Sequence, residues 1–170
     1  PLTGRALYGS EIHIWQTSLE IPEAYFTDTL SPDELVRAGA YRFREDRRRF
    51  VVRRGILRAL LSGYLNLEPG RIRFVYGKNG KPTIGNDYGG AKIYFNLSYT
   101  EDLALYAFTR KSEIGVDVES IRHLPEMVHI AELYFSPPDI ELIRSLPDNQ
   151  KSQWFFKCWQ CWLNLSGTRS

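Results

Sequence analysis

The run Gly115-Val116-Asp117-Val118-Glu119 carries the clearest chemistry in this chain, because two carboxylates stand two residues apart in it. Its apolar residues are β-branched, which favours a strand. Side chains alternate between the faces of a strand, so the two acids would share one face and the two valines the other. Two hard oxygen ligands beside a phosphate-binding surface would suit Mg²⁺. An amphipathic strand with a solvated acidic face is the alternative interpretation.

Hydroxyl and ammonium groups elsewhere in the chain could hold phosphate. Ser98 follows Asn96 at the end of an apolar run, where a hydroxyl and backbone N–H groups can cradle a phosphate. Lys78 and Lys81 lie in a glycine-rich turn and could hold a second phosphate as point charges. An ordinary Asn/Ser turn and solvated turn lysines are the alternatives, and the residues alone leave both open.

Charge is unevenly distributed, although the net charge is only +2. Between Arg37 and Arg58 the chain has nine arginines and two acids, whereas between Glu101 and Glu141 it has nine acids and three basic residues. A basic first part and an acidic later part suggest a polyanionic ligand on one side and a cation on the other. Two solvated surfaces would give the same pattern.

Several of these arginines fall on one predicted helix, but they occupy more than one of its faces. They are Arg47, Arg48, Arg49, Arg53, Arg54 and Arg58. A nucleic-acid-binding stripe would gather on a single side, so this distribution argues against a nucleic-acid partner. An arginine-rich RNA-binding module remains a distant alternative.

Composition indicates a globular chain with enough apolar residues for a core, since 43% of its 170 residues are hydrophobic. No window has the length of a transmembrane helix and the N-terminus lacks a signal pattern, so we expect a cytoplasmic location and no membrane association.

Cys158 and Cys161 have CxxC spacing late in a predicted helix. With the histidines remote in sequence, we expect buried free thiols there and no zinc site.

Hydrophobic spacing and helix-start signals place the elements that must position these residues. Ser31-Pro32 and Ser136-Pro137 each predict a helix start, and Gly55 inside a helix predicts close packing. The predicted strands are 12–17, 71–76, 93–97, 103–109 and 114–119, and the longer predicted helices are 45–64 and 150–162. This order predicts an α+β fold of two related halves, residues 1–100 and 101–170.

The order of these pieces resembles the 4′-phosphopantetheinyl transferases of the surfactin-synthetase-activating type. The resemblance runs from the first predicted strand to about Cys161. The matching segments are Leu30-Ser31-Pro32 with Arg37, Phe43 through Asp46-Arg47 to Leu57-Arg58, Gly80-Lys81-Pro82, Phe95-Asn96-Leu97-Ser98, Gly115-Val116-Asp117-Val118-Glu119, and Phe155-Phe156-Lys157-Cys158-Trp159. Each segment is weak alone, but together in this order they are specific.

The resemblance implies a holo-[acyl-carrier-protein] synthase with two pseudo-symmetric halves, and we expect this chain to be a monomer. Such an enzyme transfers phosphopantetheine from coenzyme A to a serine of an acyl or peptidyl carrier protein, with Mg²⁺ as cofactor. By this resemblance Asp117 and Glu119 match the metal-binding acids. The matching coenzyme A positions are Arg37, Lys78, Gly80, Lys81, Ser98 and Tyr99. Tyr99 replaces a family histidine, and its hydroxyl can donate to phosphate but brings no charge, so we expect weaker binding.

The chain departs from the family pattern after Trp159. Where the family has Lys-Glu and a further lysine, this chain has Trp162, Leu163 and Gly167. The missing glutamate would supply a third metal carboxylate and a candidate base, so no catalytic residue is assigned. Because the chain stops at Ser170 where relatives continue, we expect an incomplete second half, through a frameshift, a truncation or a degenerate copy. A non-catalytic remnant that binds coenzyme A or carrier protein is the alternative function.

Overall fold

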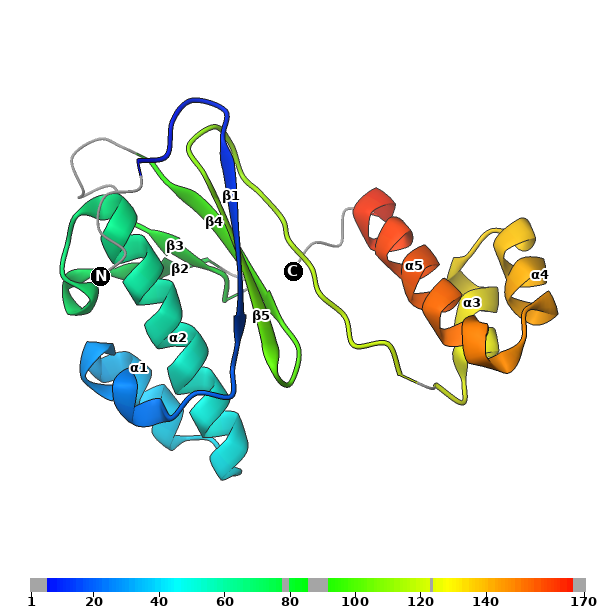
Figure 1. The fold of residues 1–170 in the computed structure, drawn as a ribbon, viewed down its shortest axis with the longest axis horizontal. Helices are drawn as coiled ribbons and strands as arrows, with labels where there is room; N and C mark the ends of the chain where they lie inside the picture. The colour runs from blue at the N-terminus through cyan, green and yellow to red at the C-terminus, as the bar shows by residue number, and fades with distance from the viewer. Residues whose placement is uncertain (1–5, 78–79, 86–91, 123, 167–170) are drawn as a thin grey trace. The chain divides into compact units, whose positions relative to one another are not determined.

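The structure is a computed structural model that describes residues 6–77, 80–85, 92–122 and 124–166, with side chains described as far as Cys161 (Figure 1). The chain forms two compact units, Pro1–Val118 and Glu119–Ser170. We call them unit 1 and unit 2 and describe each by itself.

Unit 1 is built around a three-stranded antiparallel sheet. Its strands are β1 (Ile12–Ser18), β5 (Leu103–Thr109) and β4 (Tyr94–Tyr99), in the order β1-β5-β4. A separate two-stranded sheet pairs β2 (Phe74–Tyr76) with β3 (Pro82–Ile84). Lys81, a predicted phosphate-binding residue, lies in the turn that joins β2 to β3, so this hairpin sets its position.

Unit 1 also contains two α-helices. The first, α1 (Pro32–Gly39), begins where predicted, with proline at its first position and the Ser31 N–H donating to the Glu34 carboxylate at 3.0 Å. The second, α2 (Arg44–Leu65), ends at Asn66 in the left-handed conformation. Short 3-10 turns cover Glu23–Tyr25, Thr27–Thr29 and Pro69–Arg71.

The core of unit 1 lies between α2 and the β1-β5-β4 sheet. Leu57 and Leu61 from the helix are fully buried against Tyr106 and Phe108 of β5. The close packing predicted at Gly55 is confirmed, because an added Cβ would lie 2.3 Å from the Cβ of Phe26. This packing fixes which residues of α2 face the sheet and which face solvent.

Unit 2 is helical over the residues that the structure describes. Its helices are α3 (Met127–Tyr134), α4 (Pro137–Ser145) and α5 (Asp148–Ser166). Their apolar faces bury Met127, Ala131, Ile143, Phe155 and Phe156 together. As predicted, Ser136 precedes a helix with proline at its first position, and its hydroxyl donates to the Asp139 carboxylate at 2.6 Å.

The observed elements confirm a mixed α+β fold, whereas the pseudo-symmetry of two halves, their boundary after residue 100 and the incompleteness of the second remain predictions. One predicted element is wrong: residues 113–122 have no regular secondary structure. The sequence analysis also missed β3 and α3, which are three and eight residues long. Short elements carry few periodic positions, so the pattern that predicts them is weak.

Candidate functional site

The acidic segment after β5 keeps the predicted alternation without forming a strand. Val116 and Val118 are half-buried, while Asp117 and Glu119 are exposed. The backbone does not pair with a neighbouring strand here, because its N–H groups bond to side chains instead. Val116 N–H donates to Asn96 Oδ1 at 3.4 Å, and Val118 N–H donates to the Ser98 hydroxyl at 3.1 Å. Two polar side chains of β4 therefore hold this segment in place.

Ser98 joins two parts of the predicted site. Its hydroxyl donates to Asp117 Oδ1 at 2.9 Å while it accepts the Val118 N–H. A predicted phosphate-binding residue and a predicted metal ligand, 19 residues apart in sequence, are thus in direct contact. The hydrogen bond orients one carboxylate oxygen of Asp117, whose side chain is exposed.

The two predicted metal ligands fall on either side of the boundary between the units. Asp117 belongs to unit 1 and Glu119 is the first residue of unit 2, so each is described in its own unit. Within the described ranges, no three His, Cys, Asp or Glu side chains gather as a ready metal site. The exposed Asp117 carboxylate fits the chemistry of a Mg²⁺ ion that keeps several waters, which does not require an all-protein cage.

Tyr99, the next predicted coenzyme A residue, closes β4 and is about half exposed. The guanidinium of Arg53 lies over its ring, with 3.9 Å between Cζ and the ring centroid. This contact joins the middle of α2 to the end of β4. The sequence analysis had placed Arg53 only among arginines on several faces of a helix.

The glycine-rich turn connects β2 to β3, as its residues suggested. Gly77 N–H donates to the Lys81 carbonyl at 3.2 Å, and Gly80 N–H donates to the Gly77 carbonyl at 2.9 Å. Gly80 has a φ of +72°, a conformation in which a side chain would be strained. Lys81 is half-buried beside this turn, and Lys78 lies outside the described residues.

Arg37 lies at the end of α1 and is exposed. Its guanidinium is 5.5 Å from the centroid of the Phe50 ring on α2. The same ring is 5.4 Å from the Arg53 guanidinium. Phe50 thus lies close to Arg37, a predicted coenzyme A residue, and to Arg53, which the sequence did not predict as a binding residue.

A buried ion cluster, which the sequence analysis missed, ties α1 to α2. Glu34 is 1% exposed and lies 3.2 Å from Arg54 Nε and 2.7 Å from Arg58 Nε. Arg58 also donates to the carbonyls of Pro69 and Ile72, at 2.7 and 2.9 Å. Burial lowers the pKa of Arg54. The i,i+4 spacing of the two arginines among buried leucines is the signal that could have revealed them as core residues.

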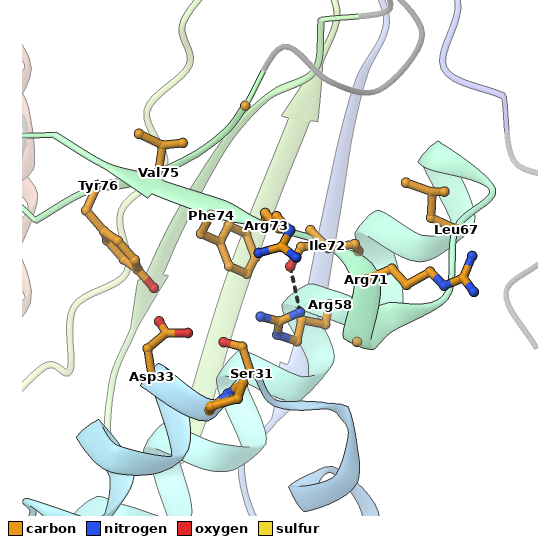
Figure 2. A pocket seen from close by; sticks show the side chains of 13 residues that line it. Ser31, Asp33, Arg58, Leu67, Arg71, Ile72, Arg73, Phe74, Val75 and Tyr76 are labelled. Atoms are coloured by element: carbon orange, nitrogen blue, oxygen red, sulfur yellow. Dashed lines mark hydrogen bonds between the residues drawn. The ribbon is translucent and has the colours of Figure 1, made fainter.

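A pocket of about 920 Å³ opens between the start of α1, the 69–71 turn and β2 (Figure 2). Arg58 lines it, and Figure 2 shows the Asp33 carboxylate and the Tyr76 hydroxyl pointing toward one another. Burial raises the pKa of Tyr76. Arg71 and Arg73 also line this pocket, but none of the predicted coenzyme A residues that the structure describes does.

The last helix carries the two cysteines, which are free thiols as predicted. Their predicted burial is wrong for Cys161, which is exposed, whereas Cys158 is half-buried and its pKa is raised by burial. Cys158 lies against Asp139 of α4, whereas Cys161 lies almost one turn further along α5. Trp162 and Leu163 belong to the same helix, but their side chains lie outside the described residues.

No described helix is long and apolar enough to cross a membrane.

Comparison with known proteins adds independent evidence. A family model described as 4′-phosphopantetheinyl transferase, N-terminal, matches residues 15–111. The 4′-phosphopantetheinyl transferase HetI of Nostoc sp. is 44% identical over 158 residues, which cover 91% of this chain and 67% of HetI. A putative 4′-phosphopantetheinyl transferase of Synechocystis sp. is 29% identical, over 76% of this chain and 52% of that protein. For Sfp of Bacillus subtilis the identity is 25%, over 79% of this chain and 57% of Sfp.

The chain therefore spans from about half to two thirds of the length of these curated relatives. The matched region contains β4, the glycine-rich turn and most of the residues on which the resemblance in sequence depends. The family model covers more than half of the chain, and the relatives share one activity in their names. On this evidence the chain belongs to the 4′-phosphopantetheinyl transferase family of enzymes.

Proposed function

We propose that this chain carries the coenzyme A-binding part of a phosphopantetheinyl transferase that modifies a serine of an acyl or peptidyl carrier protein. The observation that carries the proposal is the hydrogen bond between Ser98 and Asp117. It supports the proposal because it brings a phosphate-binding candidate and a metal-binding candidate to one place.

In the proposed reaction the serine oxygen of the carrier protein attacks the β-phosphorus of coenzyme A. A new P–O bond forms to the serine, the bond to the adenosine 3′,5′-bisphosphate part breaks, and the serine proton passes to a base or to solvent. The residues of this chain bind and orient the diphosphate for this step. Lys81 and Arg37 would neutralise phosphate charge.

Asp117 and Glu119 are the residues that would hold Mg²⁺. When bound, Mg²⁺ neutralises diphosphate charge and orients the phosphate oxygens. The Ser98 hydroxyl would hold the Asp117 carboxylate in one orientation, which limits the conformational freedom that metal binding must remove.

Binding of coenzyme A without transfer is a second candidate function, favoured by Trp162 and Leu163 at the positions where the family has Lys-Glu. Neither side chain can act as a base or carry a charge. A positioned base typically contributes 10²–10⁴-fold to a rate. Transfer by this chain would then be slower by about that factor, while coenzyme A binding in unit 1 is retained.

The two candidates are separated by intact-mass spectrometry of an apo carrier protein incubated with coenzyme A, Mg²⁺ and this chain. A mass gain of one phosphopantetheine at the rate of a full-length relative supports transfer. Coenzyme A binding in calorimetry, without a mass gain, supports the second candidate. Absence of both binding and mass gain contradicts the proposal as a whole.

A further inference from the structure

Arg53 is held by aromatic side chains on the surface of unit 1. Its guanidinium lies 3.9 Å from the centroid of the Tyr99 ring and 5.4 Å from that of Phe50. Its Nη2 is 3.5 Å from the Tyr41 hydroxyl. Aromatic rings cover the flat face of a guanidinium and leave its in-plane N–H groups able to donate.

The neighbouring arginines of α2 form ion pairs with carboxylates. Arg54 and Arg58 both pair with Glu34, and Arg48 pairs with Glu45 at 2.9 Å. Within the part of the chain that the structure describes, Arg53 makes no ion pair with a carboxylate. Its positive charge is therefore not neutralised by a described side chain.

The position of Arg53 places this charge at the end of β4. Tyr99 is the last residue of that strand and follows Ser98, which bonds to Asp117. Adjacent strand residues point to opposite faces, so Arg53 approaches the strand end on the Tyr99 side and Asp117 on the Ser98 side. A ligand that crosses the end of β4 would meet both.

We propose that Arg53, stacked on Tyr99, is a binding residue for a phosphate group of coenzyme A at the end of β4. The inference rests on the proposed function, which supplies the ligand. A guanidinium offers paired N–H donors that match two phosphate oxygens, and the Tyr99 ring restricts its orientation. Arg53 thereby supplies a charge that the neutral Tyr99 hydroxyl does not bring.

The test is calorimetric titration of the chain with coenzyme A and with dephospho-coenzyme A. Arg53→Ala should weaken coenzyme A binding about tenfold or more, as expected for lost hydrogen bonds to a charged group. It should also reduce the dependence of affinity on salt concentration. If the 3′-phosphate is the partner, the variant and the wild type should bind dephospho-coenzyme A equally. If the diphosphate is the partner, the loss should persist.

Three variants make this result specific. Arg44→Ala removes an exposed arginine of the same helix and should leave affinity within about twofold, because it removes only distant charge. Tyr99→Phe keeps the ring and should retain most of the affinity, whereas Tyr99→Leu should lose several-fold. The fold should survive substitution of Arg53, because Tyr106 donates to its main-chain carbonyl at 3.0 Å, a contact that every variant keeps.

Equal affinities of Arg53→Ala and wild type would overturn the inference, and so would equal losses in Arg53→Ala and Arg44→Ala. Neither result affects the proposed function, provided that wild type binds coenzyme A. If wild type does not bind coenzyme A, the proposed function fails. The inference is then judged by titration with inorganic pyrophosphate, in which Arg53→Ala must still bind more weakly than Arg44→Ala.

Discussion

Arg53 and Arg54 are consecutive residues of α2 in very different environments. Arg54 is 7% exposed and paired with Glu34 at 3.2 Å, in a cluster that also includes Arg58. Arg53 is half-buried, and its guanidinium lies on the ring of Tyr99. One helix thus carries a buried cluster that holds unit 1 together and, one residue away, a cation at the predicted ligand site.

The comparison shows why counting charge along this helix misleads. Arg54 and Arg58 pair with the buried carboxylate of Glu34 and stabilise the folded state. They could bind a ligand only if these ion pairs were broken. Arg53 has no carboxylate partner among the described residues and lies over the Tyr99 ring, so its in-plane N–H groups can donate to a ligand. If this distinction is right, variants of the first kind should lower stability, and variants at the ligand site should alter binding at nearly unchanged stability.

The largest expected effect is on the buried cluster. Glu34→Gln leaves the charges of Arg54 and Arg58 buried without an anion, which should lower the free energy of unfolding by about 3–5 kcal/mol. Urea denaturation followed by circular dichroism measures this change. The adjacent exposed acid is the control, since Asp33→Asn should change stability by no more than about 0.5 kcal/mol. Equal small effects of the two variants would show that the cluster does not stabilise unit 1.

A second prediction concerns the metal-binding candidate beside Ser98. Asp117→Ala should abolish the Mg²⁺ dependence of coenzyme A binding, because one remaining carboxylate is too weak a ligand for a cation that dehydrates reluctantly. Calorimetry with and without Mg²⁺ measures it. The exposed hydrogen bond from Ser98 that is lost is worth about 1 kcal/mol, so the melting curve should move little. The same Mg²⁺ response in wild type and variant would refute the metal assignment.

The smallest expected effect is at the glycine-rich turn. Lys81→Ala should weaken coenzyme A binding several-fold at low salt and less at high salt, since screening reduces the interaction of a point charge with phosphate. Titrations at two salt concentrations test this. Lys81→Arg keeps the charge and is the matched variant. A loss of affinity that is independent of salt, or present in Lys81→Arg as well, would indicate that the lysine acts through the turn and not through its charge.

Much of the fold could be predicted because its signals are local. The Ser31-Pro32 and Ser136-Pro137 helix starts, the long helix of unit 1 and the strands around residues 94–99 and 103–109 all lie where capping and apolar spacing placed them. The strand predicted at 114–119 does not form. The alternation of apolar and polar residues there was read correctly. The N–H groups of Val116 and Val118, however, donate to the Asn96 and Ser98 side chains of β4 and not to its backbone, and this choice of partner is a tertiary property.

For the candidate site too, the sequence predicted the residue types, whereas the contacts between them appear only in the structure. Residue types and their order predicted Ser98, Lys81 and Asp117 as binding candidates, because the chemistry of phosphate and Mg²⁺ restricts which side chains can serve. The contact between Ser98 and Asp117 and the stacking of Arg53 on Tyr99 join segments that are remote in sequence. No local pattern encodes such a contact.

The sequence by itself determined the family, the α+β class and the residue types available for binding phosphate and metal, since these depend on composition, spacing and order. Only the tertiary structure decided which charges are available. Glu34 neutralises Arg54 and Arg58 because α1 packs on α2, and Arg53 faces the end of β4 because Gly55, Leu57 and Leu61 turn the helix toward the core. Burial and pairing are properties of neighbours in space, and they separate a structural arginine from a binding one.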